Sequence, residues 1–316
     1  MRDVRDLRLE FRIPISPTPG FFSQVRAFEF ALWRLGPPYS TARLIVCVGD
    51  NCDLETVRAA NAWSGNRVRW EAVPKSVFDE FGIHGTADWR WLLPSGDADL
   101  IILSDADTVL LRDIDPMLAT MTLDRAAVRG HMAHGPPPSV GGGLPDGKGY
   151  WPALFTRFGA AWPDRLFSYS MDENGLFSQV PAYFNLGFVA CSPAALSIVG
   201  GQIFEFQREF MREIDSNMRC QIAVSVLSYR NSIDVNVLPA SYNAANDLVH
   251  LRNNYISSTD IRVLHYLRND EIDRSTIFQP EHLDGFLAAE LKNPANRALQ
   301  ALAREFKAHV VEVRPL

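Results

Sequence analysis

The sequence has few cysteines, no clustered basic residues and no long apolar stretch, and each absence excludes a class of protein. Its four cysteines contain no Cys-x-x-Cys pair, which argues against a zinc ribbon or a disulfide framework. The formal charge is −6 without a run of Lys or Arg, so binding to nucleic-acid backbone is not expected. No uncharged apolar stretch approaches the roughly 20 residues that span a bilayer. Residues 1–16 alternate charged and apolar side chains, unlike a secretory signal. We expect a cytoplasmic protein, with peripheral association at a membrane left open.

The first half of the chain alternates between strand and helix patterns. The expected strands lie at 7–15, 42–50, 67–73 and 99–107. The expected helices lie between them, at 23–36 with Ser23 as the cap, at 54–63, and at 86–94 with Thr86 as the first residue. This order predicts an α/β fold with a mainly parallel sheet and helices on both faces. In such sheets ligands bind at the carboxyl ends of the strands.

The second half has a different composition. Residues 130–180 are rich in Gly, Pro and aromatic residues and predict a long irregular segment. Beyond it, strands are expected at 183–192, 233–239 and 260–267. Helices are expected at 193–214, 218–230, 280–291 and 296–310. Because no Ser/Gly-rich or charged linker divides the chain, we expect one large unit with appendages.

Two acids follow directly on an apolar strand in "LIILSDADTVLL". Asp105 and Asp107 stand two residues apart, so in extended backbone both carboxylates point the same way. Mg²⁺ in proteins takes oxygen ligands from carboxylates and from substrate phosphates. The apolar residues on both sides argue against an ordinary acidic loop. The pair is therefore a candidate site for a metal that holds a diphosphate.

Two families share this pattern. "LIILSDADTVLL" resembles the Asp-x-Asp-x-Thr motif of haloacid-dehalogenase-like phosphatases, in which Asp105 would be the nucleophile, and the Asp-x-Asp motif of GT-A glycosyltransferases. The phosphatase motif normally opens the fold and is followed by a Lys and a Gly-Asp-x-x-x-Asp motif, neither of which is found here. The βα units before the acids favour the glycosyltransferases. A nucleotide-sugar pyrophosphorylase is disfavoured, because "FRIPISPTPGFF" lacks the expected Gly-rich basic loop.

Further stretches carry the glycosyltransferase resemblance. "TADWRWLLP" is similar to the helix before the motif, and Arg90 matches an arginine that reaches the donor. "YFNLGF" resembles the Phe-Asn-x-Gly strand of the retaining galactosyltransferase and glycogenin-like family, with Asn185 facing the donor sugar and Gly187 matching. "VLHYLR" resembles the late histidine that completes the metal site, which implies that His265 is a third ligand of Mn²⁺ or Mg²⁺. "LPASYNAAND" is similar to the Leu-Pro-x-x-Tyr-Asn segment of that family.

The chain also departs from that family. "HYLRNDEID" lacks the Gly and the Lys-Pro-Trp run, and Arg268 is the candidate replacement for the lysine at the phosphates. "RCQIAV" keeps Gln221 but has Cys220 where the family has an acid. Asp172 or Glu173 could act as general base if the reaction inverts configuration. Retention or inversion therefore stays open.

Taken together, the resemblance implies a metal-dependent glycosyltransferase that uses a nucleotide-diphosphate sugar, a UDP-sugar by the resemblance. The acceptor is open among a glycan, a lipid-linked sugar, a protein and a small molecule, and so is the oligomeric state. The expected catalytic domain covers 1–272, with a nucleotide-sugar half at 1–115, an acceptor half at 116–272 and a helical extension at 273–316. The expected site comprises Asp105, Asp107 and His265 at the metal, Arg90, Asp105, Gly187 and Arg268 at the donor, and Asn185, Gln221 and Asp172 in catalysis. The alternatives are the phosphatase and a sugar-nucleotide-binding protein without activity.

Overall fold

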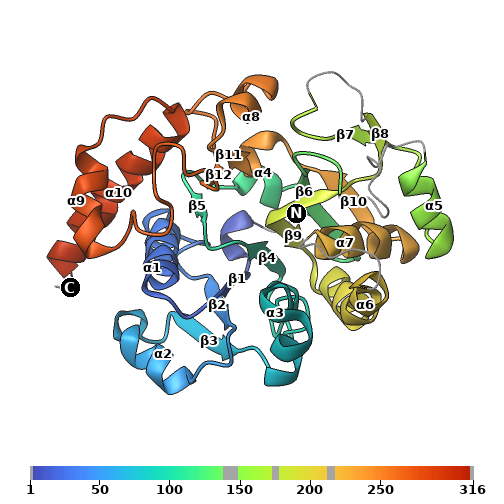
Figure 1. Ribbon diagram of the computed structural model, residues 1–316, viewed down its shortest axis with the longest axis horizontal. Helices are drawn as coiled ribbons and strands as arrows, with labels where there is room; N and C mark the ends of the chain where they lie inside the picture. The colour runs from blue at the N-terminus through green and yellow to red at the C-terminus, as the bar shows by residue number, and fades with distance from the viewer. Residues whose placement is uncertain (1–2, 138–148, 173–177, 212–217, 314–316) are drawn as a thin grey trace.

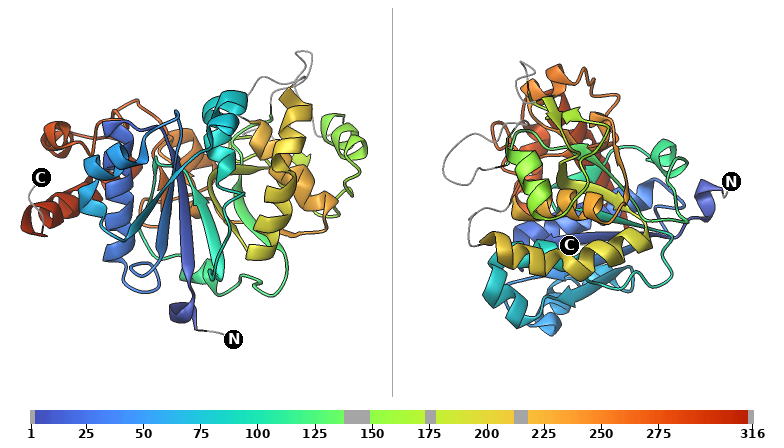
Figure 2. Two further views of the ribbon diagram at one scale, coloured as in Figure 1. Left: turned by 90° about the horizontal axis from the view of Figure 1, so that it is seen from below. Right: turned by 90° about the vertical axis from the view of Figure 1, so that its right-hand side faces the viewer.

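The computed structural model describes residues 3–137, 149–172, 178–211 and 218–313. A seven-stranded sheet forms the centre, with helices on both of its faces, and a smaller three-stranded sheet lies beside it (Figures 1 and 2). The α/β fold with a mainly parallel sheet is therefore confirmed.

The central sheet has the strand order β10-β6-β9-β4-β1-β2-β3. Its strands are β1 (Leu9–Ile15), β2 (Arg43–Val48), β3 (Val68–Ala72), β4 (Leu100–Ser104), β6 (Ala127–Met132), β9 (Phe184–Cys191) and β10 (Asp234–Val237). Only β9 runs antiparallel to its two neighbours, β4 and β6. The small sheet consists of β5 (Thr108–Leu110), β12 (Val263–His265) and β11 (Ala244–Ala245), and β7 (Phe167–Ser168) pairs with β8 (Ser178–Val180).

The helices confirm most of the expected segments. They are α1 (Pro19–Arg34), α2 (Leu54–Ala60), α3 (Lys75–Trp89), α4 (Asp115–Leu118), α5 (Tyr150–Arg157), α6 (Pro193–Met211), α7 (Arg219–Arg230), α8 (Leu248–Asn253), α9 (Pro280–Ala288) and α10 (Pro294–Val313). Within the described residues, no helix has both the length and the apolar character needed to cross a membrane.

Two hydrophobic cores lie on opposite faces of the sheet, and β4 contributes to both. Its alternate residues Leu100 and Ile102 pack in the core with β1, β2, α1 and α2, whereas Ile101 and Leu103 pack in the core with α6 and α7. All four side chains are buried. This explains the continuous apolar run of β4, because a strand covered on both faces needs no polar alternation.

Two expected helix starts are wrong. The helix expected at 86–94 instead spans Lys75–Trp89, with Gly82 at φ 59° interrupting its helical backbone, so Thr86 lies inside it. The first helix begins at Pro19, and its cap is Thr18, whose side chain accepts from Phe21 N at 3.4 Å. The Ser23 hydroxyl donates to Gly20 O within the helix. Pro19 opens the first helix, because the fixed φ of proline suits the first turn, whereas Pro74 is the non-helical cap residue that precedes Lys75–Trp89.

The irregular segment expected at 130–180 contains more structure than its composition indicates. Strand β6 extends to Met132, and α5 and the β7–β8 pair follow. The polar residues of β6 obscured its strand pattern, but they are buried with partners: Arg129 pairs with Asp234 at 2.7 Å, and His131 Nδ1 bonds Leu238 O at 3.1 Å. Residues 138–148 of that expected segment, and Glu173, lie outside the described residues.

The C-terminal helices pack against α1, as Figure 2 shows. The rings of Phe30 and Phe306 lie 5.7 Å apart at the α1–α10 contact. Polar contacts join this region to the chain before β12, since Asn246 receives a hydrogen bond at its backbone O from Asn293 and donates one to Asn296 Oδ1. The segment between β12 and α9 is thereby held next to the carboxyl end of the sheet.

Candidate metal and donor site

The two acids occupy a tight turn between β4 and β5. Asp105 N donates to Gly187 O at 3.0 Å, which ties the turn to β9. The Thr108 hydroxyl donates to Asp105 O at 2.7 Å. These bonds fix the turn at the carboxyl end of β4, where the sequence predicted a ligand site.

His265 joins the acids through the small sheet. Strand β12 pairs antiparallel with β5, and His265 lies opposite Thr108. One ligand atom from each of Asp105, Asp107 and His265 lies within 4.8 Å of the others. His265 Nε2 is 3.2 Å from Asp107 Oδ1. The expected set of three ligands is therefore assembled in space.

A network of amides behind the site sets the orientation of His265. Asn243 Nδ2 donates to Asn185 O at 3.2 Å, so its Oδ1 is left to accept from His265 Nδ1 at 3.1 Å. Asn185 Oδ1 also accepts from Gly187 N at 2.8 Å. A proton on Nδ1 leaves Nε2 with its lone pair toward Asp107. Two acceptors facing each other at 3.2 Å require either a proton or a metal ion between them.

Burial and charge shift the pKa values of the three groups in different directions. Burial, reinforced by the neighbouring Asp107, raises the pKa of Asp105 despite the opposing effect of Arg90. Burial also works to raise the pKa of Asp107, but His265 and Arg274 outweigh it, and the net pKa is lowered. Burial opposes protonation of His265, yet the two carboxylates raise its pKa overall. The negative charge of the two carboxylates thus favours a positive charge on the His265 ring.

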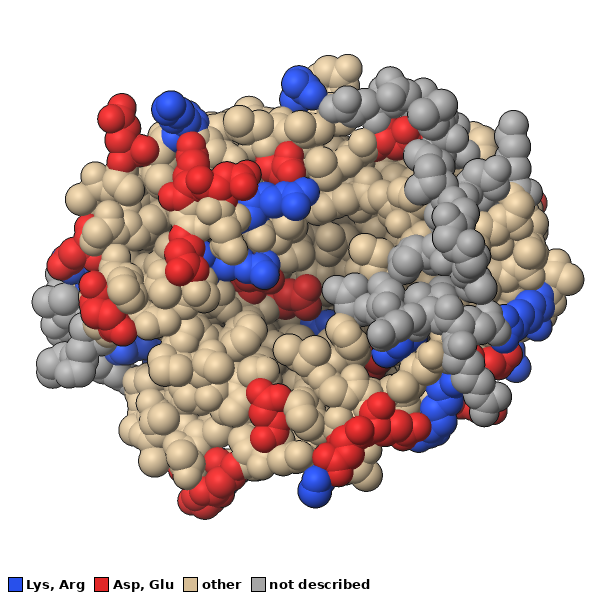
Figure 3. Space-filling view, in the orientation of Figure 1, with Lys and Arg blue, Asp and Glu red and all other residues tan. Residues whose placement is uncertain are grey.

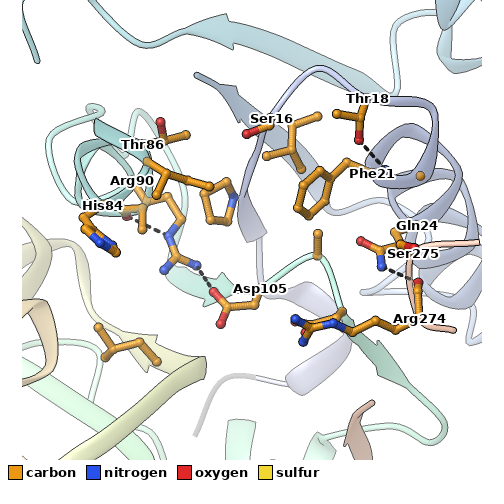
Figure 4. A pocket seen from close by; sticks show the side chains of 18 of the residues that line it. Ser16, Thr18, Phe21, Gln24, His84, Thr86, Arg90, Asp105, Arg274 and Ser275 are labelled. Atoms are coloured by element: carbon orange, nitrogen blue, oxygen red, sulfur yellow. Dashed lines mark hydrogen bonds and ion pairs between the residues drawn. The ribbon is translucent and has the colours of Figure 1, made fainter. Parts of the chain in front are cut away.

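Each acid also faces an arginine. The Arg90 side chain is 1% exposed at the end of α3, and its Nη1 donates to Ser104 O at 2.7 Å and lies 3.3 Å from Asp105 Oδ1. Arg274, from the segment before α9, places Nη1 2.5 Å from Asp107 Oδ2. Figure 4 shows the two guanidinium groups on opposite sides of Asp105.

A pocket of about 520 Å³ opens over these groups. Its walls come from the β1–α1 connection with Ser16 and Thr18, from α1 with Phe21, from α3 with Thr86, and from α7 with Gln221. Figure 3 shows the hollow near the middle of this face, with acidic and basic side chains around it. Its size is within the range of small-molecule sites.

The structure brings together most of the predicted residues. Arg90, Asp105, Asp107 and Gln221 line the pocket. His265 lies with the two acids in a group that could hold a metal ion. Asn185 and Gly187 lie behind it, where a Cβ on Gly187 would meet the His265 ring, 2.5 Å from Nδ1.

Two predicted residues lie elsewhere. Arg268 is not among the residues that line the pocket; its Nε bonds Asp247 Oδ2 at 2.9 Å. Asp172 follows β7, and its backbone N donates to Tyr169 O at 3.2 Å. Both roles therefore remain predictions.

Three residues that bear on the site were not predicted. Arg274 follows "NDEID", a run without a motif. Asn243 lies in "LPASYNAAND", whose similarity was noted without a role. Asp88 is fully buried in α3, accepts from Gln207 Nε2 at 2.8 Å, and has Cys220 as an electrostatic neighbour. Of these three residues, only Asn243 had a signal in the sequence, because it lies in a segment similar to that of the family and precedes His265.

Comparison with known proteins gives a fold but no sequence relative. No known protein-family profile matches the sequence, and no curated protein matches it. Among solved structures, the galactosyltransferase LgtC in complex with donor and acceptor sugar analogs is 12% identical, covering 94% of this chain and 95% of its own, with a TM-score of 0.55.

Two further structures resemble the chain. The bifunctional glycosyltransferase WbbM is 13% identical over 88% of this chain and 50% of its own (TM-score 0.54). The glycosyltransferase GlyE of Streptococcus pneumoniae TIGR4 is 10% identical over 97% and 64% (TM-score 0.50). Identities this low establish architecture alone. The chain has the fold of the GT-A-type glycosyltransferases.

Proposed function

We propose that this protein is a metal-dependent glycosyltransferase that moves a sugar from a nucleotide-diphosphate donor, a UDP-sugar, to an acceptor. The observation that carries the proposal is the convergence of Asp105, Asp107 and His265 beneath a pocket that also contains two arginines. This arrangement combines ligands for a divalent cation with groups that bind phosphate.

The residues present fit a divalent metal. Two carboxylates and one imidazole form a mixed oxygen and nitrogen set, which suits Mn²⁺ and Mg²⁺ better than a thiolate metal. The contact from His265 Nδ1 to Asn243 would leave Nε2 as the ring atom that holds such an ion. Such an ion supplies Lewis-acid stabilisation to the charge that grows on a departing diphosphate.

The two arginines support the same chemistry from the protein side. Arg90 is held rigidly by Ala87 O and Ser104 O and presents its guanidinium at the metal end of the pocket. Arg274 lines the pocket from the opposite side. Guanidinium groups form charge-assisted, often bidentate hydrogen bonds to phosphate oxygens. They would hold the diphosphate and stabilise it as the bond to the sugar breaks.

The sugar belongs, in this proposal, at the end of the pocket formed by Leu186, Cys220 and Gln221. Asn185 is not among the residues that line this end; its Oδ1 accepts from Gly187 N and from Asn243 Nδ2, so its part in the proposal is to support Asn243 and through it His265. The Gln221 amide lies in the pocket wall on α7 and can orient a sugar hydroxyl. The nucleoside then extends toward Phe21 and the β1–α1 connection, where an aromatic face is present for a base.

A melting-temperature screen tests the proposal. The protein is heated with Mn²⁺ together with each of UDP, ADP, GDP and CDP, and slow release of nucleotide from the matching sugar donors is followed. We expect stabilisation that requires Mn²⁺ and is lost in Asp107→Ala. A shift that persists in Asp107→Ala would contradict the site assignment.

The alternatives give different results in the same assays. An acid-stable, base-labile phosphate on Asp105 would identify a phosphatase instead. Metal-dependent binding of a nucleotide sugar without any release or transfer would identify a binding protein. The first outcome is not expected, because the Asp105 carboxylate already faces Arg90.

A further inference from the structure

Arg274 occupies an oxygen of the carboxylate that a metal ion would also need. Its Nη1 lies 2.5 Å from Asp107 Oδ2, while His265 Nε2 lies 3.2 Å from Oδ1. Both oxygens of Asp107 are therefore engaged by groups that donate a hydrogen bond or carry positive charge. A divalent cation placed among these ligands would lie close to the guanidinium, and like charges in a half-buried site repel strongly.

Hydrogen bonds hold the backbone at this position, whereas the side chain is partly exposed. Gln24 Nε2 donates to Arg274 O at 2.7 Å, and Arg274 N donates to Asn269 Oδ1 at 3.2 Å. Within the described part of the chain, the guanidinium donates to Asp107 alone, and its side chain is 40% exposed. Arg90 differs, since its side chain is 1% exposed and bonds two carbonyl oxygens. Of the two arginines, Arg274 is the one that can change partner.

The same pocket offers that partner. Arg274 and Ser275 line it together with Asp105 and Asp107, so a guanidinium that leaves Asp107 stays beside the position proposed for the diphosphate. A diphosphate oxygen on a bound metal ion carries the negative charge that Arg274 would lose by giving up the carboxylate. Before the exchange Arg274 makes a charge-assisted hydrogen bond to Asp107, and after it Arg274 makes one to the diphosphate.

We infer that Arg274 is an exchangeable counter-ion of the metal site. Without metal it neutralises Asp107 and competes with the cation, and in the loaded site it binds the diphosphate. Metal and nucleoside diphosphate consequently bind with positive coupling. The diphosphate draws Arg274 away from the metal ion, and the metal ion replaces Arg274 as the partner of Asp107. This inference rests on the proposed function, since it takes the metal and the diphosphate from it.

The test measures Mn²⁺ affinity by the electron paramagnetic resonance signal of free Mn²⁺, with and without UDP, or whichever of ADP, GDP and CDP stabilises the wild type most. We expect Arg274→Gln to bind Mn²⁺ alone more tightly than the wild type by roughly two- to tenfold, the range of a partly exposed ion pair. With the diphosphate present, the variant should bind Mn²⁺ less tightly than the wild type does. The coupling between the two ligands therefore shrinks.

The matched control breaks an arginine–carboxylate ion pair outside the proposed metal site. Arg125 pairs with Asp234, which keeps Arg129 as a second partner, just as Asp107 keeps His265. Arg125→Gln should leave both Mn²⁺ affinities unchanged. Arg274→Lys, which keeps a cation on a flexible stem, should retain more of the coupling than Arg274→Gln.

Unchanged or weaker binding of Mn²⁺ alone by Arg274→Gln, with a wild-type melting temperature, would overturn the competition. A coupling equal to that of the wild type would overturn the transfer to the diphosphate. Failure of the proposed function gives another pattern: the wild type binds no Mn²⁺, or its binding survives Asp107→Asn. The two failures are therefore separable.

Discussion

The His265 ring packs against Gly187, where a side chain would otherwise lie. Substituting this glycine by alanine is therefore the most direct perturbation of the site. A Cβ at position 187 would lie 2.5 Å from His265 Nδ1, closer still to Cε1, and 3.0 Å from Asn185 Oδ1. Real Cβ contacts are essentially never that short. Gly187→Ala must therefore displace the His265 ring from Asn243 and Asp107, because β9 is held in the central sheet on both sides.

The expected cost has two parts. Overpacking a buried site costs about 1–3 kcal/mol of unfolding free energy. Loss of the ring's orientation should weaken Mn²⁺ binding by about 10- to 100-fold, the usual range when a metal ligand loses its supporting contacts. Urea unfolding and a Mn²⁺ titration measure the two parts separately.

The control is another glycine-to-alanine change. Gly201 lies in α6, and its added Cβ would have nothing within 4 Å. Because alanine is favoured over glycine in a helix by up to about 1 kcal/mol, Gly201→Ala should stabilise the protein and leave Mn²⁺ binding unchanged. Wild-type stability and wild-type Mn²⁺ affinity in Gly187→Ala would refute the packing argument.

Three further predictions follow from particular contacts. Asn243→Ala should lower Mn²⁺ affinity by about 10-fold or more, because His265 loses the acceptor that fixes its ring, whereas Asn243→Asp should lose less; the titration above compares them. Arg12→Met should cost about 3–5 kcal/mol in urea unfolding, since three backbone carbonyls lose their donor and buried Glu10 loses one of two arginines and is left with Arg43; a cost below 1 kcal/mol would contradict this. Burial raises the pKa of Asp88 from 3.8 to about 7, so between pH 4 and 7 the folded protein keeps a proton that the unfolded chain releases, and stability falls as pH rises. Asp88→Asn should therefore stabilise the protein by roughly 1–4 kcal/mol at pH 8 and by little at pH 4, as urea unfolding at both pH values would show.

The order of strands and helices could be predicted from the sequence because it depends on local pattern. Alternate residues of β4 pack into cores on opposite faces of the sheet, so the whole strand is apolar. Such a continuous apolar run can be recognised in the sequence. The helix starts were less accurate, since Thr86 and Ser23 both resemble caps, whereas the helices begin after Thr18 and Pro74. Caps compete locally, and tertiary packing selects among them.

The site shows the same division. Asp105 and Asp107 were evident from their place after β4, and a motif resemblance pointed to His265, but nothing local determined which residues support or oppose a metal there. Arg268 and Arg274 are both arginines after His265, and the sequence favoured the first. The structure pairs Arg268 with Asp247 and brings Arg274 to Asp107 because Gln24 on α1 holds the segment before α9. Sequence alone determined the order of the elements and the acids at the end of a strand. Only the tertiary structure decided which distant side chains meet them, because hydrogen bonds between segments remote in sequence set that choice.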